Sequence, residues 1–224
     1  MGHVRRLIAF DLDGTLVDSR RDLAESANQL ITERGGSPLA EAAVGRMVGE
    51  GVALLVRRAL AAAGLRDAPD ALQRFIEIYD DRLLNHTRAY DGIADAVLAA
   101  RRHARVAVLT NKAAGPSERI LKALGLRELF DDIVGGDGPL PRKPDPAALV
   151  VLMAQAGAAA SDTLMVGDSA IDHQTARRAS SRCCVAAYGF GYETFPAETL
   201  TGEEWIAADP RDVHGIIERF AEGT

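Results

Sequence analysis

The sequence predicts an α/β fold in which a parallel, helix-covered sheet carries an inserted helical domain. Short apolar runs that end in polar residues alternate with helical patterns along most of the chain, which is typical of a parallel sheet. Residues 19–88 break this alternation, because they contain no convincing strand and read as consecutive helices. At 224 residues, 47% of them hydrophobic, the chain is long enough for a core domain with a smaller insert.

The predicted strands are the short apolar runs. They cover residues 7–10, 106–109, 164–166 and 183–187. Helices are expected between them, over residues 117–124 and 147–156, because a glycine in the stop position follows each pattern. A last helix is expected to start at Asp209, with Pro210 in the first helical position and Asp212 in the third.

The insert is expected to form a small helical bundle. Ser19 and Asp22 have the spacing of a capping box at the start of its first helix, which would end at Gly35. The following helices are expected to begin at Ser37, at Val52 and at Pro69.

Charge and cysteine content limit the classes of function. With 26 Lys plus Arg against 32 Asp plus Glu, the net charge is −6, so no duplex nucleic-acid partner is expected, and an anionic substrate would need a locally positive pocket. Cys183 and Cys184 are neighbours that cannot join distant segments, which favours a reducing, cytoplasmic location. No apolar stretch reaches the roughly 20 residues of a membrane helix, and no signal peptide is expected.

Two carboxylates follow the first predicted strand. Asp11 and Asp13 lie two positions apart, and Gly14 permits a sharp turn that brings backbone N–H groups toward a ligand. Carboxylates this close repel each other unless a cation or a shared proton offsets the repulsion, and such an oxygen site suits Mg²⁺. An ordinary Asp-Gly turn at a strand end is the alternative.

Polar residues also follow the later strands. Thr110 and Asn111 offer a hydroxyl and an amide N–H to phosphate oxygens, although such a pair is also typical of a turn or a helix cap. Lys143 is one of three lysines in an arginine-rich chain, so its compact ammonium is a candidate bridge between carboxylate and phosphate rather than a solvated loop residue. Asp168 is a candidate metal ligand, which Asp172 would support unless it is an ordinary first-turn helix residue.

These sites occur in a fixed order along the chain. They are Asp11-Leu12-Asp13-Gly14-Thr15, Leu109-Thr110-Asn111, Lys143-Pro144-Asp145-Pro146 and Gly167-Asp168-Ser169-Ala170-Ile171-Asp172. The set resembles the four motifs of the haloacid-dehalogenase-like phosphatase superfamily, and residues 48–52, 110–112 and 188–192 are similar to its phosphoglycolate phosphatase branch. The resemblance implies a Rossmann-like core of residues 1–17 and 89–224 and an α-helical cap of residues 18–88.

The resemblance also implies a mechanism. Asp11 would attack phosphorus and form an aspartyl phosphate, while Asp13 would protonate the leaving alkoxide and then deprotonate the hydrolytic water. Mg²⁺ would be held by Asp11, the backbone carbonyl of Asp13 and Asp168, with Asp172 supporting them. The residues expected to bind the phosphoryl group are Gly14, Thr110, Asn111 and Lys143.

The expected substrate is a small anionic phosphorylated metabolite, with 2-phosphoglycolate favoured. Gly49 and Gly51 lie in a loop between two cap helices, where backbone N–H groups can approach a carboxylate, although a plain interhelical turn is equally compatible. Arg46, Arg57 and Lys112 are the candidate positive charges, and the sequence does not separate them. A monomer or homodimer is expected, without nucleic-acid or membrane partners.

Other members of the same fold are the main alternatives. A sugar-phosphate phosphatase or a phosphosugar mutase would share every core motif, whereas a non-catalytic binding module is less favoured because all four motifs are intact. A dehalogenase would lack Asp13, and a phosphonate hydrolase would need a lysine in the cap, where residues 18–88 contain none.

Overall fold

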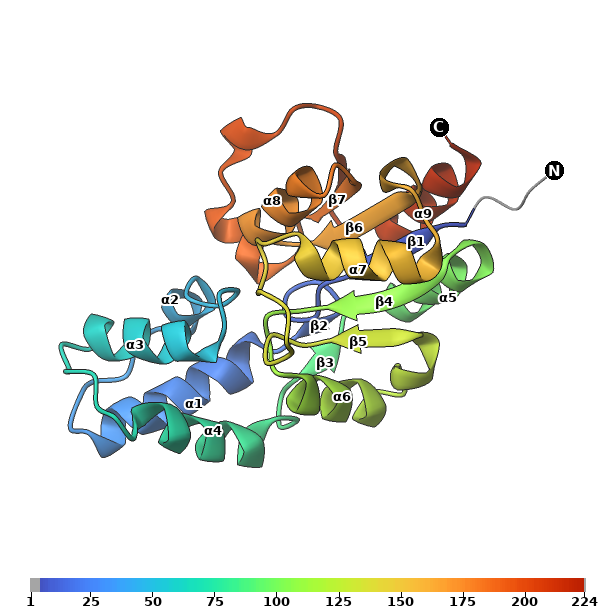
Figure 1. Cartoon of the computed structure of the whole chain (residues 1–224). Coiled ribbons are helices and arrows are strands. Elements are labelled where there is room, and N and C mark those ends of the chain that lie inside the picture. Colours follow the sequence, from blue (N-terminus) through green and yellow to red (C-terminus); the bar gives the residue numbers. More distant parts are fainter. Residues whose placement is uncertain (1–4, 224) are drawn as a thin grey trace.

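The computed structural model describes residues 5–223, which form a large sheet with its helices and a separate group of four helices (Figure 1). The six strands of the large sheet are parallel and lie in the order β5-β4-β1-β6-β7-β8. Their bounds are β1 Leu7–Phe10, β4 Arg105–Leu109, β5 Asp132–Val134, β6 Thr163–Gly167, β7 Arg182–Ala186 and β8 Trp205–Ala207. The predicted α/β fold is confirmed.

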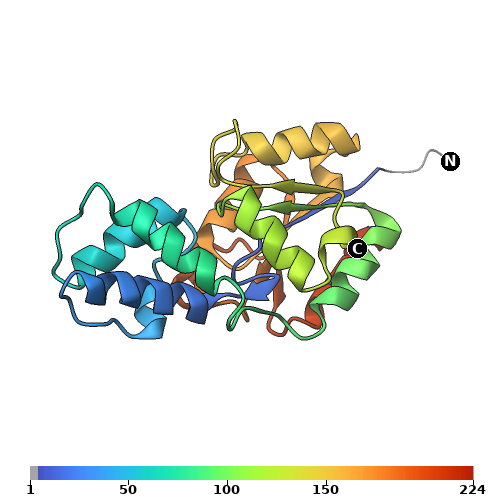
Figure 2. The same ribbon diagram turned by 90° about the horizontal axis from the view of Figure 1, so that it is seen from below.

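Helices cover both faces of this sheet. Ile8 and Phe10 of β1 belong to one buried cluster, and Leu7 and Ala9 belong to another, because successive side chains of a strand point to opposite faces. The first face packs against α5 (Ile93–His103), α6 (Ala114–Ala123) and α9 (Asp212–Glu222), and the second against α7 (Ala147–Ala156) and α8 (Ala170–Arg178). Figure 2 shows α7 on one side of the sheet and α5 and α6 on the other.

The four predicted strands are present as β1, β4, β6 and β7, whereas the sequence pattern missed β5 and β8. These two strands are the edges of the sheet and have only three residues each, mostly half-buried. An edge strand is paired on one side only, so it needs no long apolar run. The missed strands are therefore those with the weakest local signal.

The four remaining helices lie between two short strands that pair antiparallel, β2 (Val17–Asp18) and β3 (Arg88–Ala89). They are α1 (Arg20–Glu33), α2 (Glu41–Gly45), α3 (Val52–Ala62) and α4 (Ala71–Arg82). Leu30, Leu60 and Phe75 are fully buried among them. The division into a core of residues 1–17 and 89–224 and a cap of residues 18–88 stays a prediction, and we use these two names below.

One predicted helix cap and several predicted helix starts differ from the structure. The capping box of Ser19 and Asp22 is wrong, because α1 has no side-chain cap and both side chains bind elsewhere. A capping box forms instead at Ser169 and Asp172, at the start of α8. The helices expected at Ser37 and Asp209 begin later, as α2 and α9, because proline and capping signals mark a turn without fixing the first helical residue.

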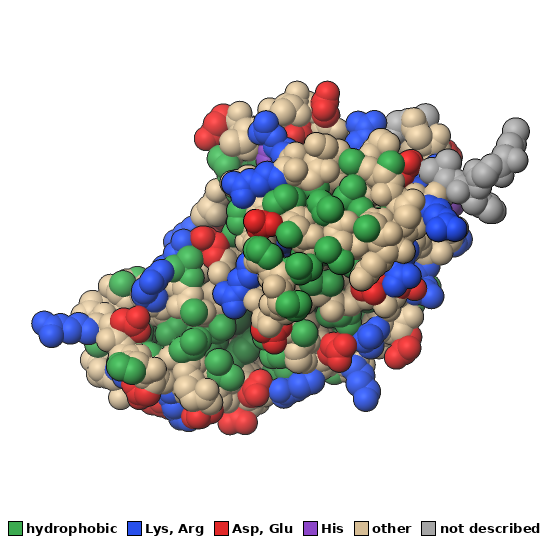
Figure 3. Space-filling view, in the orientation of Figure 1, with side chains coloured by type: hydrophobic (Ala, Val, Ile, Leu, Met, Phe, Trp, Pro, Cys, Tyr) green, Lys and Arg blue, Asp and Glu red, His purple; other side chains and the backbone are tan. Residues whose placement is uncertain are grey.

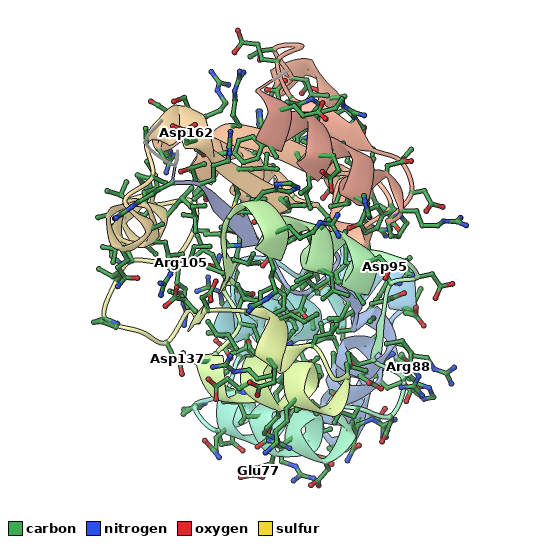
Figure 4. All side chains as sticks on the ribbon, turned by 90° about the vertical axis from the view of Figure 1, so that its right-hand side faces the viewer. Glu77, Arg88, Asp95, Arg105, Asp137 and Asp162 are labelled. Atoms are coloured by element: carbon green, nitrogen blue, oxygen red, sulfur yellow. The ribbon has the colours of Figure 1, made fainter. Side chains whose placement is uncertain are left out.

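The outside of the molecule is charged. Glu77 on α4, Asp95 on α5 and Asp137 after β5 are exposed (Figure 4). Within residues 5–223, no helix combines the length and the apolar character needed to cross a membrane. Cys183 and Cys184 are both buried free thiols.

Candidate active site

The candidate active site lies at the carboxyl ends of β1, β4 and β6. Strand β1 lies between β4 and β6 and pairs with both. The order of the strands reverses at β1, and α/β sheets bind ligands at such a switch point. A cavity of about 420 Å³ opens here between the sheet and helices α1, α3 and α4 of the cap. Figure 3 shows hydrophobic side chains gathered along the junction between cap and core.

Asp11 is fixed at the floor of this cavity. It directly follows β1, its N–H donates to the carbonyl of Val166 at 2.9 Å, and its residue surface is 7% exposed. The Nζ of Lys143 lies 2.9 Å from its Oδ1. Burial raises the pKa of Asp11 to about 6 against the opposing effect of this lysine. The carboxylate is therefore held in place while part of its charge remains uncompensated.

Lys143 is buried and connects two carboxylates. Its Nζ lies 2.9 Å from Asp11 Oδ1 and 2.6 Å from Asp172 Oδ1, and its side chain is 2% exposed. Burial lowers the pKa of Lys143, but these two carboxylates outweigh it and raise the pKa to about 12. A solvated loop lysine does not fit these contacts, and the ammonium stands where it can also reach a phosphoryl group on Asp11.

Three buried carboxylates converge around this lysine. Asp11, Asp168 and Asp172 each offer an oxygen within 4.8 Å of the others. Asp172 Oδ2 accepts hydrogen bonds from the N–H and hydroxyl of Ser169, and Asp168 Oδ2 accepts one from the N–H of Gly191 at 2.7 Å. Burial, followed by the neighbouring charges of Asp172 and Asp11, raises the pKa of Asp168 well above its ordinary value. One ammonium cannot balance three carboxylates, so the donor set fits a hard divalent cation.

Asp13 has a different partner. Its carboxylate lies 3.0 and 3.1 Å from the Nζ of Lys112 and accepts a 2.5 Å hydrogen bond from the hydroxyl of Ser19. Burial disfavours the charge on Lys112, but Asp13 raises the pKa of this lysine above its ordinary value. The repulsion expected between Asp11 and Asp13 is thus met by one lysine for each carboxylate. Sequence reasoning missed Ser19 and the Asp13–Lys112 pair; the scarcity of lysine was the available signal.

Thr110 and Asn111 follow β4, and both are buried at the cavity. The Thr110 hydroxyl accepts the N–H of Lys112 at 3.2 Å, which leaves its own hydrogen free for a ligand. The Asn111 side-chain amide donates to the carbonyls of Gly49 and Lys143, while its Oδ1 is buried without a partner. Both side-chain hydrogens of Asn111 are thus already donated, and its predicted contact with a phosphate stays a prediction.

Gly14 has a steric role in this structure. Its φ of +87° is left-handed, its N–H donates to the carbonyl of Val17 at 2.8 Å, and a Cβ would lie 1.8 Å from Asp168 Oδ2. Its own N–H is therefore used inside the turn, and the missing side chain makes room for Asp168; the predicted approach of the turn's backbone N–H groups to a ligand stays a prediction.

Gly189 and Gly191 also pack against Asp168. Sequence analysis identified the motif that contains these two glycines, but it did not predict their contact with Asp168.

The predicted cap loop reaches the same cavity. Gly49 and Gly51 both line it, with φ values of +115° and +92°. The carbonyl of Gly49 accepts a hydrogen bond from Asn111 at 2.8 Å, which ties the loop to the core. The structure thus brings the four motifs and this loop around one cleft.

Comparison with known proteins agrees with this arrangement. Residues 8–186 match the family model of haloacid dehalogenase-like hydrolases. The chain is 44% identical to a phosphoglycolate phosphatase of Rhodospirillum rubrum, over 84% of this chain and 82% of the relative, and 41% identical to one of Cereibacter sphaeroides, over 86% and 89%. A crystal structure described as a predicted phosphoglycolate phosphatase from Haemophilus somnus superimposes with a TM-score of 0.86 at 30% identity, over 95% of this chain and 97% of that one. The chain belongs to the haloacid dehalogenase-like hydrolase family.

Proposed function

We propose that this protein is a Mg²⁺-dependent phosphatase that hydrolyses 2-phosphoglycolate to glycolate and phosphate. The observation that carries the proposal is the pair of strand-end carboxylates, Asp11 and Asp13, each held by its own buried lysine. Such a pair supplies a nucleophile and a separate acid-base group at one cleft. The substrate follows from the relatives named phosphoglycolate phosphatase at 37–44% identity.

In the first half-reaction, a carboxylate oxygen of Asp11 attacks phosphorus, and the bond between phosphorus and the ester oxygen breaks. Asp13 gives its proton to that oxygen, which becomes the hydroxyl group of glycolate. Glycolate leaves, and Asp11 carries the phosphoryl group. In the second half-reaction, Asp13 takes a proton from water, the water oxygen attacks phosphorus, and the bond between phosphorus and the Asp11 oxygen breaks. Phosphate leaves and both aspartates return to their starting forms.

The buried carboxylate cluster would hold the metal. We assign the ligands to Asp11, Asp168 and the backbone carbonyl of Asp13, with Asp172 holding Lys143 and the start of α8 in position. When bound, Mg²⁺ would neutralise charge on the transferring phosphoryl group. The hydroxyl of Thr110 and the ammonium of Lys143 would bind the phosphoryl oxygens.

The cap would cover the substrate during both steps. Gly49 and Gly51 bring backbone close to the cavity, and closing it excludes bulk water from the reacting phosphoryl group. The partner is a small phosphorylated metabolite, without nucleic acid or membrane. The monomeric or homodimeric state and the cytoplasmic location stay predictions.

Phosphate release from a panel of phosphorylated metabolites tests this function. We expect 2-phosphoglycolate to give the highest kcat/KM in Mg²⁺, and we expect excess EDTA to abolish release until Mg²⁺ is restored in excess. A preference for hexose phosphates would assign the protein to the sugar-phosphate phosphatases, and interconversion of sugar phosphates without release would assign it to the mutases. Undiminished release in EDTA would remove Mg²⁺ from the mechanism.

A further inference from the structure

We propose that Lys112 of the core and Tyr79 of the cap together form the subsite that recognises the carboxylate of the substrate. The inference rests on the proposed function and names the residues that select a carboxylated substrate. It answers a question that the sequence leaves open, since Arg46, Arg57 and Lys112 were equal candidates for this charge.

Two of these candidates are excluded by position. Arg46 does not line the cavity and pairs with Glu193 at 3.5 Å. Arg57 lines a different pocket, on the outer side of α3. Among the described residues, the cations that line the cavity are Lys112 and Arg119.

Arg119 is the poorer of the two cavity cations. Its guanidinium donates to both the carboxylate and the backbone carbonyl of Asp80, and its side chain is 53% exposed at the cavity mouth. The side chain of Lys112 is only 8% exposed. A partly desolvated ammonium attracts a small anion more strongly than a solvated guanidinium that already has two acceptors.

The position of Lys112 matches the shape of 2-phosphoglycolate. Its Nζ is within 3.1 Å of both carboxylate oxygens of Asp13, the group that would protonate the ester oxygen. In the substrate, the carboxylate is attached to the same carbon as that ester oxygen. A cation beside the acid is therefore also beside the substrate carboxylate, and it can exchange one carboxylate partner for the other.

Tyr79 supplies the second donor. Its ring centroid lies 4.7 Å from the Nζ of Lys112, and its hydroxyl is buried at the cavity, where it interacts with this ammonium. An ammonium cannot accept a hydrogen bond, so the hydroxyl hydrogen has no acceptor among the described residues, and a substrate carboxylate would supply one. Because Tyr79 belongs to α4 and Lys112 follows β4, the subsite is complete only when the cap stands over the core.

The selectivity for a carboxylate is the quantity to measure. We compare kcat/KM in Mg²⁺ for 2-phosphoglycolate and for ethyl phosphate, which lacks only the carboxylate function. In Lys112→Met the ratio of the two values should fall about 10- to 100-fold, the range expected for loss of a charge-assisted hydrogen bond. Tyr79→Phe removes one hydrogen bond to the carboxylate but leaves the ammonium in place, so it should lower the ratio less, about 3- to 10-fold.

Two control variants, Lys122→Met and Arg119→Met, test whether the effect is specific to the proposed subsite. Lys122→Met, at an exposed lysine of α6, should leave the ratio unchanged. Equal losses on both substrates in Lys112→Met would overturn the subsite, because Lys112 would then act only through Asp13, and so would a fall of the ratio in Arg119→Met alone. If the parent protein does not turn over 2-phosphoglycolate, the proposed function fails and the subsite with it; if the parent does and the variants keep its ratio, the subsite alone fails.

Discussion

The core wall and the cap wall of the cleft are built from different contacts. On the core wall, Asp11, Asp168, Asp172 and Lys143 are all less than 10% exposed. Lys143 forms ion pairs with Asp11 and Asp172, and Asp168 accepts a hydrogen bond from the N–H of Gly191. On the cap wall, the side chains are mostly apolar, among them Val48, Val52, Leu55 and Ile76. The charged residues of the candidate site thus lie on the core wall. The apolar side chains of the cap wall can change without disturbing a buried charge.

Besides the hydrogen bond from Ser19 to Asp13 and the pairs of Arg20 and Arg46 with Glu193, three polar contacts join the cap to the core at the cleft. Asn111 donates to the carbonyl of Gly49, Lys112 lies over the ring of Tyr79, and Arg119 pairs with Asp80 at the mouth. Of these contacts only the Arg119–Asp80 pair is exposed, and exposed ion pairs contribute little to stability. The other two involve buried groups and would have to separate if the cap moved away. Changes at Asp11, Asp168, Asp172 and Lys143 should therefore affect every substrate alike. Changes on the cap wall, and at Lys112 of the core, should affect substrates differently.

The largest effect is expected at the nucleophile. Asp11→Asn removes the attacking charge but keeps the shape of the side chain, so kcat should fall by about 10⁴-fold or more for every substrate. Circular dichroism and the melting temperature should show a folded protein. Phosphate release within tenfold of the parent rate would contradict the assignment of Asp11.

A smaller but still general loss is expected at Lys143. A planar guanidinium in Lys143→Arg is too large for the space between Asp11 and Asp172, so kcat should fall about 10²-fold, as when one fixed donor to the transition state is lost. The loss should be equal for 2-phosphoglycolate and p-nitrophenyl phosphate. Lys122→Arg is the matched control at an exposed lysine, and normal kinetics in Lys143→Arg would place this residue outside the site.

A selective effect is expected on the cap wall. In Gly49→Val, a β-branched residue would have to adopt φ near +115° beside the cavity, so the loop would shift. The KM for 2-phosphoglycolate should rise about tenfold, by roughly 1.4 kcal/mol of lost binding, and less for p-nitrophenyl phosphate. Gly64→Val is the control, because Gly64 also has positive φ but lies at the end of α3 with open space around it. Equal changes in KM for both substrates would contradict a role in selectivity.

The smallest effect is a pH dependence of the metal-free core. Burial raises the pKa of Asp11 from 3.8 to about 6, so the folded protein holds this proton more tightly than the unfolded chain does. The contribution of the protonated Asp11 carboxyl to the free energy of unfolding is therefore complete below about pH 4, and it is lost as the pH rises through 6. Urea unfolding in EDTA should show the parent losing stability relative to Asp11→Asn over that window. Parallel curves for the two proteins would contradict it.

Local sequence patterns predicted four of the six strands of the large sheet and the edge at which the candidate site lies. Asp11, Thr110 and Asp168 each follow an apolar run, and the carboxyl ends of parallel strands meet at one edge, so their convergence was predictable. The scarcity of lysine also pointed to Lys143 as a partner of a carboxylate, and the structure pairs it with Asp11 and Asp172.

Only the tertiary structure decided which donor meets which acceptor. Ser19 and Asp22 have the spacing of a capping box, yet Ser19 binds Asp13, and Asp22 accepts the N–H groups of His86 and Thr87 at the other end of the cap. Tyr79 meets Lys112 only because α4 folds back over the end of β4. Local sequence patterns fix backbone conformation and burial, because those depend on near neighbours along the chain. The partner of a buried polar group depends on which distant segment packs against it, and a buried group must find a partner wherever the fold supplies one.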